Sequence, residues 1–231
     1  MRATLSDSSL ARVAGRFVWL ELDYDKPVNQ AVIAQRGVVG TPTLYVLDPV
    51  TERATATHIG GLTLPELSHF LDQGERAFKG SAKTPADAAL TRGDELLGLG
   101  RLADAASAYR EALRLLAPGR PERLRVIGSL TWTLWVNNEA QACAEIAAEE
   151  APAMARGETF GATVLAGFAS SNRGGEAPLA RRTRTVLEPL AVEAIGLPTV
   201  LRDHRFQLYQ HLMMAAQTRG DTITVARWGH R

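Results

Sequence analysis

Val38-Val39-Gly40-Thr41-Pro42-Thr43 runs directly into the apolar stretch Leu44-Tyr45-Val46-Leu47, and these ten residues decide the fold of the first third of the chain. A continuous apolar run of strand length is typical of a strand that is covered on both faces. Asp48-Pro49 then begins a turn. The β-branched and polar residues 55–59 predict a second strand, which Gly60-Gly61 ends. We therefore expect a loop, a strand, a hairpin turn and a second strand.

The flanking segments predict helices and one further strand. Residues 7–14 predict a short helix, and the apolar run 17–22 predicts a strand. Residues 29–36 predict a helix that Gly37 stops. Thr63 and Glu66 have the spacing of a capping box, so another helix is expected to begin there. This succession of helices and strands favours an α/β fold.

This order of elements resembles the C-terminal half of a thioredoxin-like domain, over residues 17–78. The stretch Val38–Leu44 looks like the V-x-G-x-P-T loop that precedes the fourth strand of that family. Leu22-Asp23 at a strand end and Gly60-Gly61 before the last helix match the family as well.

The resemblance implies a binding role for Gly40, Thr41 and Pro42. It implies that the peptide bond before Pro42 is cis and that the backbone of Thr41 offers hydrogen-bonding groups to an extended substrate peptide. Without the resemblance we would expect a trans bond, because only about 5–6 % of X-Pro bonds in folded proteins are cis. Thr41-Pro42 would then simply shape the loop, and both interpretations stay open.

The chain departs from the family in its thiol chemistry. The resemblance implies a Cys-x-x-Cys at the start of the helix before the strand at 17–22, where a helix N-terminus lowers the pKa of one thiol and the second resolves the mixed disulfide. The only cysteine is Cys143. Dithiol exchange is therefore not expected of the chain as written.

A central strand is missing as well. The resemblance places a strand between segments 17–22 and 44–47, so these two segments would have to pair directly or leave hydrogen-bonding groups unsatisfied. Two explanations stay open. In the first, Met1 is an internal methionine of a longer protein and the dithiol lies upstream of it. In the second, the chain is a truncated scaffold whose strands pair in a different order. An unpaired strand edge would also favour dimerisation or aggregation.

The rest of the chain predicts paired helices. Residues 79–83 predict a linker, and Thr84 with Pro85 predicts a helix start. The following residues resemble the roughly 34-residue TPR pattern. The matching positions are Gly93, Gly100, Ala105, Tyr109, Ala112 and Pro118. Further helix pairs are expected over 123–136 with 139–150, 158–170 with 178–195, and 205–218 with 221 onward. The resemblance implies a TPR-like solenoid with a concave surface.

The expected fold class is thus α/β followed by all-α. A partial thioredoxin-like domain covers residues 1–78, a linker covers 79–83, and TPR-like helical repeats cover 84–231.

Four features of the helical part are expected to be structural. Trp132 and Trp135 lie three residues apart on one helical face and are expected to fill the core between helices rather than grip a ligand. Arg219-Gly220-Asp221 spells an adhesion tripeptide but also suits a TPR turn. Arg181, Arg182 and Arg184 are expected on a solvated helix face, and Cys143 is expected to be a small packing residue.

The composition excludes several classes of partner and cofactor. Lys plus Arg number 26 against 25 for Asp plus Glu, and a net charge of +1 gives no argument for a nucleic-acid partner. No run of about 18 apolar residues exists, so we expect no membrane span. The five histidines lack His-x-x-x-His spacing and only one cysteine is present, so we expect no disulfide within the chain, no metal and no cofactor.

Two functions stay open. The first is a protein- or peptide-binding scaffold without catalysis. The second is a fragment of a thiol–disulfide oxidoreductase whose Cys-x-x-Cys lies upstream of Met1. Residues 1–7 lack the apolar region of a signal peptide, so the compartment stays open, although the resemblance implies an extracytoplasmic setting for a longer form. A small-molecule enzyme has no support, since we find no Gly-rich phosphate loop and no Ser/His/Asp order.

Overall fold

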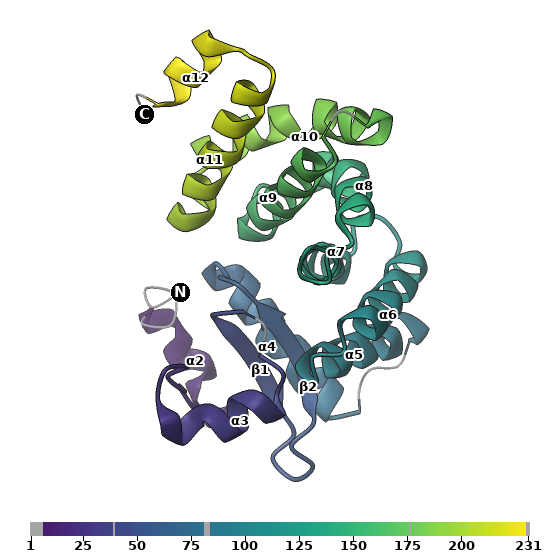
Figure 1. Cartoon of the computed structure of the whole chain (residues 1–231). Helices are drawn as coiled ribbons and strands as arrows, with labels where there is room; N and C mark the ends of the chain where they lie inside the picture. Colours follow the sequence, from purple (N-terminus) through teal and green to yellow (C-terminus); the bar gives the residue numbers. More distant parts are fainter. Residues whose placement is uncertain (1–6, 39, 81–83, 176, 230–231) are drawn as a thin grey trace.

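A computed structural model describes residues 7–38, 40–80, 84–175 and 177–229. The α/β region comprises η1 (Ser8–Leu10), α2 (Ala11–Ala14), η2 (Pro27–Asn29), α3 (Gln30–Gln35), β1 (Thr43–Leu47), β2 (Ala54–Ile59) and α4 (Leu64–Phe78). The helical region comprises α5 (Pro85–Gly98), α6 (Leu102–Leu115), α7 (Pro121–Val136), α8 (Ala140–Glu150), η3 (Ala151–Ala153), α9 (Glu158–Arg173), α10 (Pro178–Gly196), α11 (Arg202–Thr218) and α12 (Thr222–Gly229). Helices α5 to α12 form an arc, and the two strands and α4 lie on its inner side (Figure 1). A short α/β region is therefore followed by paired helices.

The two predicted hairpin strands are confirmed. β1 and β2 pair antiparallel with Tyr45 opposite Thr57, and the register shifts between Val46 and Leu47. One face of the sheet packs on α4, where a Cβ added to Gly74 would lie 2.6 Å from Val46. The other face packs on α5, where a Cβ added to Gly98 would lie 3.4 Å from the ring of Tyr45. The sheet is thus covered on both faces, as the apolar run predicts.

The strand predicted at residues 17–22 is wrong. These residues form neither helix nor strand, and the side chains of Val18 and Leu20 are 90% and 81% exposed. The physical reason is the lack of a pairing partner, because within the described residues β1 and β2 pair only with each other. The two apolar segments therefore do not pair directly, and a rebuilt sheet that includes 17–22 is not observed.

The predicted helices of the α/β region form, with shifted ends. The helix predicted over 7–14 is the short pair η1 and α2, and the one predicted over 29–36 is α3, preceded by the 3-10 turn η2. Gly37 follows α3 with a φ of 55°, which suits the stop predicted there. The capping box of α4 is confirmed, because the backbone N–H of Thr63 donates to Glu66 Oε2 at 2.9 Å.

The first predicted helix pair is α5 and α6. Thr84 caps α5 by accepting a hydrogen bond from the backbone N–H of Asp87. Gly93 lets the two helices approach, since a Cβ there would lie 2.6 Å from the ring of Tyr109. Gly100 makes the turn with a φ of 69°. Of the predicted linker, residues 81–83 lie outside the described part of the chain.

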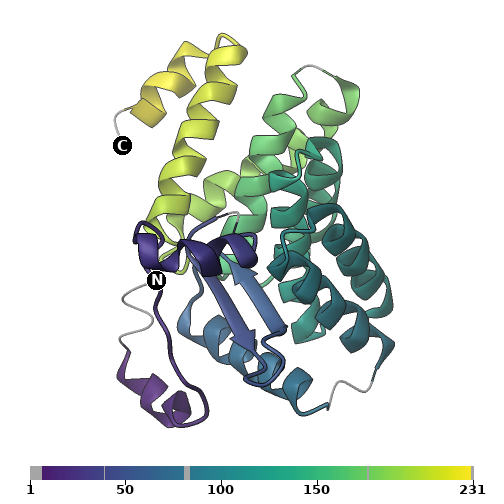
Figure 2. The ribbon, with the colours of Figure 1, turned by 60° about the horizontal axis from the view of Figure 1, so that its bottom comes forward.

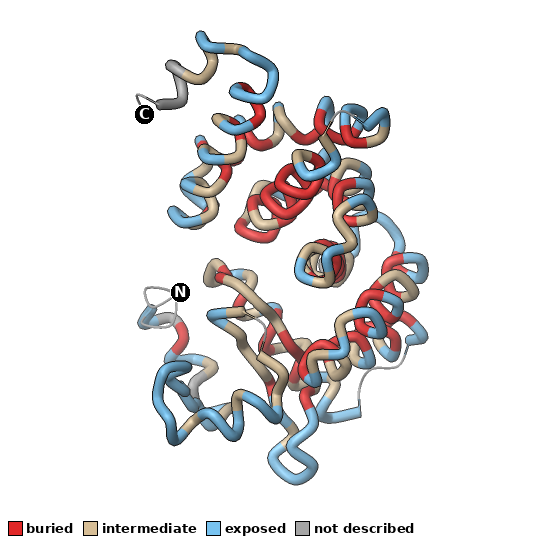
Figure 3. Tube along the Cα trace, in the orientation of Figure 1, coloured by how far each residue is buried: buried red, intermediate tan, exposed pale blue. Residues whose placement is uncertain are grey.

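The later helix pairs also form, and α9 is buried along nearly its whole length among them (Figure 3). Trp132 and Trp135 are partly buried and pack against the helical core, which confirms the packing interpretation. Cys143 is buried and its thiol donates to the carbonyl of Thr131 at 3.3 Å. Within the described residues, none of the helices combines the length and apolarity that a bilayer span requires.

Two surface expectations have different outcomes. Gly220 forms the turn between α11 and α12, where its N–H donates to Gln217, and Arg219 pairs with Glu188 at 2.7 Å. The prediction of a solvated arginine cluster is partly wrong. Arg181 and Arg182 are exposed, whereas Arg184 is buried, because its guanidinium donates to the carbonyl of Gly175 in the loop before α10.

Candidate binding edge and the seam that holds it

The loop Gly40-Thr41-Pro42 lies at the start of β1 and keeps the backbone of Thr41 accessible. Thr41 and Pro42 are exposed, Gly40 is half-buried, and the Thr41–Pro42 peptide bond is cis, as the resemblance implies. The carbonyl of Pro42 accepts a hydrogen bond from the N–H of Gly60 at 2.8 Å, and Thr43 Oγ1 donates to the carbonyl of Gly40 at 2.5 Å. Neither the N–H nor the C=O of Thr41 has a hydrogen-bond partner among the described residues. The three predicted residues thus lie on one loop at the start of β1, and the backbone of Thr41 is free to bond to a ligand.

The outer edge of β1 continues this accessible backbone. In an antiparallel pair, successive residues direct their N–H and C=O alternately toward and away from the partner strand. Pro42 bonds to β2, and so does Asp48, whose N–H donates to Arg53 at 2.9 Å. The backbone groups of Thr43, Tyr45 and Leu47 therefore point away from β2, where no described strand pairs with them. Residues 43–47 also contain no charged residue and no proline, the usual means by which an edge strand is blocked.

Three glycines let this loop and its neighbours pack closely against the helical region, because they have no Cβ atom. A Cβ added to Gly40 would lie 3.1 Å from Cζ2 of Trp132 on α7. A Cβ on Gly37 would lie 2.9 Å from the Cα of Gly100, and one on Gly61 would lie 2.0 Å from Cδ1 of Leu201. We call this contact surface between residues 37–66 and the helices the seam. Sequence reasoning identified the loop but not Trp132 as its support.

A buried ion pair lies in the seam. Asp94 on α5 is 0% exposed, and Arg125 on α7 donates from Nη2 to Asp94 Oδ2 at 2.7 Å and to the carbonyl of Thr57 at 2.9 Å. The hydroxyl of Tyr109 donates to Asp94 Oδ1 at 2.7 Å, and Thr57 Oγ1 donates to the carbonyl of Asp94 at 2.8 Å. Burial raises the pKa of Asp94, while the charge of Arg125 opposes that rise. The signal in the sequence was a carboxylate among the apolar and small positions of α5, flanked by Leu90 and Leu97.

Glu66 caps two helices at once. Its Oε2 accepts from the N–H and hydroxyl of Thr63 at the start of α4, and its Oε1 accepts from the N–H and hydroxyl of Thr159 at the start of α9, at 2.8 and 2.6 Å. Burial raises the pKa of Glu66, but the hydrogen bonds from Thr159 and Thr63 outweigh it and the pKa is lowered overall. One carboxylate therefore joins the α/β region to the helical region.

A similar contact follows along the chain. Buried Glu158 accepts from the backbone N–H of Leu201 at 2.5 Å and contacts Nδ1 of His204. Leu201 precedes α11, so Glu158 caps that helix from α9. Within the described residues, no group of three or more His, Cys, Asp or Glu side chains could hold a metal ion.

His58 on β2 is a titratable group in the seam. Its Nε2 lies 3.3 Å from the carbonyl of Gly61, and its ring packs edge-on against Phe70 with centroids 6.2 Å apart. Burial lowers the pKa of His58 to about 4, and the positive charge of Arg125 acts in the same direction. Glu66 and His204 are the other charged or titratable groups that act on it. His58 is thus held neutral at pH 7.

This depressed pKa predicts a loss of stability in acid. A histidine has a pKa of about 6.5 when unfolded, so the unfolded state takes up the proton first as the pH falls. The stabilising contribution is complete above about pH 6.5 and is lost progressively toward pH 4. We expect the free energy of unfolding to fall by about 2–3 kcal/mol more between pH 7 and pH 4.5 in the wild type than in a His58→Gln variant. Urea unfolding at a series of pH values measures this difference. The matched control is His69→Gln, which removes an exposed histidine of α4 and should keep the wild-type pH profile; identical profiles for both variants would contradict the prediction.

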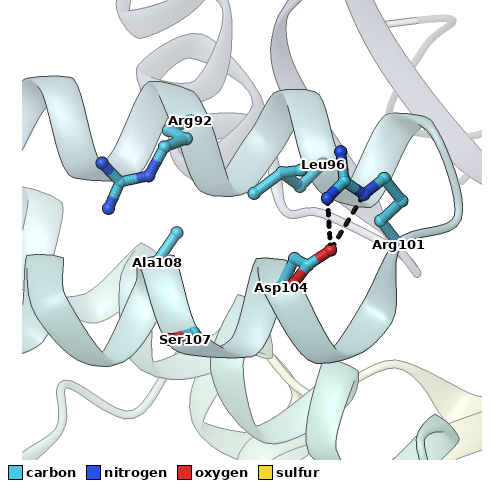
Figure 4. A pocket seen from close by; sticks show the side chains of 6 residues that line it. All are labelled: Arg92, Leu96, Arg101, Asp104, Ser107 and Ala108. Atoms are coloured by element: carbon cyan, nitrogen blue, oxygen red, sulfur yellow. Dashed lines mark hydrogen bonds and ion pairs between the residues drawn. The ribbon is translucent and has the colours of Figure 1, made fainter.

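A shallow hollow between α5 and α6 offers no comparable site. It is lined by Arg92, Leu96, Arg101, Asp104, Ser107 and Ala108 (Figure 4). Arg101 is paired with Asp104 at 2.6 Å, and Arg92 is paired with Glu111. Because both cations already have carboxylate partners, the hollow presents no unpaired charge for a ligand.

Comparison with known proteins does not assign a function to this site. Comparison with family profiles, with curated proteins and with solved structures found no match to this chain. The features that indicate a function are therefore the open edge of β1, the loop at residues 40–42 and the seam that supports them.

Proposed function

We propose that this chain is a thioredoxin-like and TPR-like scaffold without catalytic activity, and that it binds an extended segment of a protein partner along the outer edge of β1. The observation that carries this proposal is the set of outward backbone groups at Thr41, Thr43, Tyr45 and Leu47, which have no partner strand among the described residues. Adding a strand to an exposed sheet edge is a common mode of peptide recognition. The loop Gly40-Thr41-Pro42 would lie at one end of the bound segment.

The inner, concave side of the helical arc is largely occupied, which favours the edge of β1 as the binding surface. Stacked helix pairs commonly bind partners on their concave side. Here the chain's own α/β region covers much of that side. The sheet and its loop contact Gly98 on α5 and Trp132 on α7, and Glu66 of α4 contacts Thr159 on α9. The outer edge of β1 faces away from helices α5 to α12 (Figure 1), and none of the described strands pairs with it.

The single thiol supports a role without thiol chemistry. Burial raises the pKa of Cys143 to about 11, so the reactive thiolate is scarce at pH 7. Cys143 also lies on α8 in the helical core, where it is 0% exposed. It is not placed to serve as a nucleophile for a segment bound at β1.

A second candidate function is a thiol–disulfide oxidoreductase whose Cys-x-x-Cys lies upstream of Met1. The open outer edge of β1 favours it, because the resemblance places there the strand that leads into the dithiol helix. Translating the reading frame upstream of Met1 and measuring the mass of the native N-terminal peptide decides between the two. A Cys-x-x-Cys in frame supports the oxidoreductase, and a native start at Met1 leaves the scaffold.

Strand addition predicts a specific effect of proline at Leu47. Peptides of about ten residues are selected from a random display library against the wild type, and their dissociation constants are measured by fluorescence anisotropy. Leu47→Pro removes one outward N–H from an exposed edge, where proline is tolerated. We expect it to weaken binding about tenfold or more, equivalent to about 1.4 kcal/mol.

Leu47→Ala is the matched control, because it shortens the same side chain and keeps the N–H. It should bind the selected peptides within about twofold of the wild type, and circular dichroism should show that both variants are folded. Equal affinity of Leu47→Pro and Leu47→Ala for every selected peptide would overturn strand addition at β1.

A further inference from the structure

The buried apolar residues of the protein form two separate clusters. One lies within helices α5 to α11 and contains Leu90, Leu130 and Phe160. The other is smaller, lies within the α/β region and contains Leu67 and Phe70. Each region therefore has an apolar core of its own, which it keeps if the contacts across the seam change. Relative motion is the default across such an interface within one chain, unless the interface is large and apolar.

The two sides of the seam differ in the kind of contact they make. On the α5 side the contact is close packing, since a Cβ added to Gly98 would lie 3.2 Å from side chains of β2. On the α9 and α11 side, Glu66 bonds to Thr159, and Gly61 packs against Leu201. In both views α5 lies beside the sheet, and the N-terminal end of α11 points toward the α/β region (Figures 1 and 2). The α5 side is thus built as a hinge, and the other side depends on a few polar bonds.

The geometry around Glu66 leaves no place for a proton. Each carboxylate oxygen accepts from a backbone N–H, Oε2 from that of Thr63 and Oε1 from that of Thr159. A backbone N–H can only donate, so a protonated oxygen would face a donor. Burial raises the pKa of Glu66, but these bonds outweigh it and the pKa is lowered. A proton on Glu66 therefore weakens its bond to Thr159.

His58 responds to acid in the same direction. The charged or titratable groups of this part of the seam are Glu66 of α4, Asp94 of α5, Arg125 of α7, Glu158 of α9 and His204 of α11. Asp94 is paired with Arg125, and Glu158 contacts His204. Burial lowers the pKa of His58 to about 4, and Arg125 acts in the same direction. A proton on His58 thus adds a positive charge to the closed seam at the pH at which Glu66 loses its negative one.

We propose that the seam is a pH-sensitive contact, which opens on its α9 and α11 side in acid while both regions stay folded. In the closed form the α/β region covers the concave side of the helical arc. In the open form the sheet stays packed on α5, and the surface around Thr159 and Leu201 becomes accessible. The protons enter at Glu66 and His58. This inference does not depend on strand addition at β1, because it concerns the surface that the α/β region covers.

One backbone amide reports on this side of the seam. Thr159 is the second residue of α9, so its N–H has no partner within the helix and bonds to Glu66 Oε1 at 2.8 Å. Phe168 lies further along the same helix, is 0% exposed and supplies the control amide. Hydrogen exchange of both amides is measured by NMR from pH 7 to pH 4.5. Far-UV circular dichroism and small-angle X-ray scattering are recorded on the same samples.

We expect the protection of the Thr159 amide to fall at least about tenfold between pH 7 and pH 4.5, the factor that one pKa unit corresponds to. Protection at Phe168 and the helical dichroism should not change. A compact chain of 231 residues has a radius of gyration of about 17 Å and an unfolded one about 50 Å, so opening should add only a few ångström. Equal loss of protection at both amides would show unfolding as a whole, and no loss at Thr159 would show a closed seam; either result would overturn the proposal.

A reversible crosslink provides the matched control. The variant is Gly61→Cys with Leu201→Cys. A Cβ on Gly61 would lie 3.3 Å from Cγ of Leu201, one bond from its Cβ, and a disulfide needs Cβ atoms about 3.5–4.5 Å apart. Cys143, buried in the helical core, is the only other thiol. The oxidised variant should keep the protection of Thr159 in acid, and the reduced variant should lose it as the wild type does. A loss in the oxidised variant equal to that of the wild type would overturn opening on this side.

Two further variants identify the groups that take up the protons. Glu66→Gln keeps the size of the side chain but turns an amide N–H₂ toward a donor, so Thr159 should exchange at least about tenfold faster than in the wild type already at pH 7. His58→Gln takes up no proton, so its protection should fall less in acid than that of His69→Gln, which removes an exposed histidine. Equal falls in these two histidine variants would overturn the role of His58, and wild-type protection in Glu66→Gln at pH 7 would overturn that of Glu66.

Discussion

Asp94→Ala is expected to lower the free energy of unfolding by about 3–5 kcal/mol. The substitution leaves the guanidinium of Arg125 without its carboxylate, although that side chain is only 10% exposed. It also removes the acceptor of the Tyr109 hydroxyl, whose side chain is 0% exposed. The cost is large because an uncompensated buried charge costs far more than the net gain from the intact pair. Urea unfolding at pH 7, followed by circular dichroism, measures it.

Asp104→Ala is the matched control for this substitution. Asp104 pairs with Arg101 at 2.6 Å, but both side chains are more than half exposed, so the loss should stay below about 1 kcal/mol. A double variant, Asp94→Leu with Arg125→Met, should recover much of the lost stability, because an apolar pair of similar size removes both charges together. If Asp94→Ala cost no more than Asp104→Ala, the ion pair would not hold the seam.

Local signals explain which parts of the fold could be predicted from the sequence. The capping boxes at Thr63 and Thr84 involve residues three positions apart, and both form as expected. Gly93 and Tyr109 meet within one helix pair, so a short pattern is enough to identify them. Such features depend on neighbours in the chain and are visible without the tertiary structure.

The strand at residues 17–22 could not be judged this way. Its apolar run has the same form whether or not a partner strand exists, and pairing is a contact between distant segments. In the candidate site, too, the local motif could be predicted and the distant contact could not. Gly40, Thr41 and Pro42 were visible as a loop motif, whereas the support from Trp132 comes from α7, roughly ninety residues further along the chain.

Glu66 combines both cases in one side chain. Its spacing from Thr63 predicts the cap of α4, and the structure shows that bond. Its second set of bonds reaches Thr159, 93 residues away, and no pattern near either residue indicates it. What the sequence presents as a helix cap is therefore also the contact that joins two regions of the protein.

Glu66→Ala is accordingly expected to cost more than the loss of an ordinary cap. A cap substitution costs about 1 kcal/mol, but here the N–H groups and hydroxyls of both Thr63 and Thr159 lose a charged acceptor. We expect the free energy of unfolding to fall by about 2–4 kcal/mol, since hydrogen bonds to charged groups are worth about 1.5–3 kcal/mol each and solvent replaces part of them. Urea unfolding measures the loss, and hydrogen exchange at the Thr159 amide should speed up with it.

The pH dependence of this loss distinguishes the carboxylate from simple packing. The pKa of Glu66 is lowered in the folded protein, so its contribution is present above about pH 4.5, the usual value for an unfolded glutamate, and is lost as the pH falls through the lower folded value. The difference in free energy of unfolding between the wild type and Glu66→Ala should therefore shrink in acid. The Glu66→Gln variant keeps the size of the side chain, so at pH 7 its free energy of unfolding should lie between those of the wild type and Glu66→Ala. Glu75→Ala is the control on the same helix. Among the described residues Glu75 pairs with Lys79 and Arg16, both at the surface, so its loss should cost less than about 1 kcal/mol. A loss for Glu66→Ala that is no larger than for Glu75→Ala, and that does not change with pH, would mean that the carboxylate does not join α4 to α9.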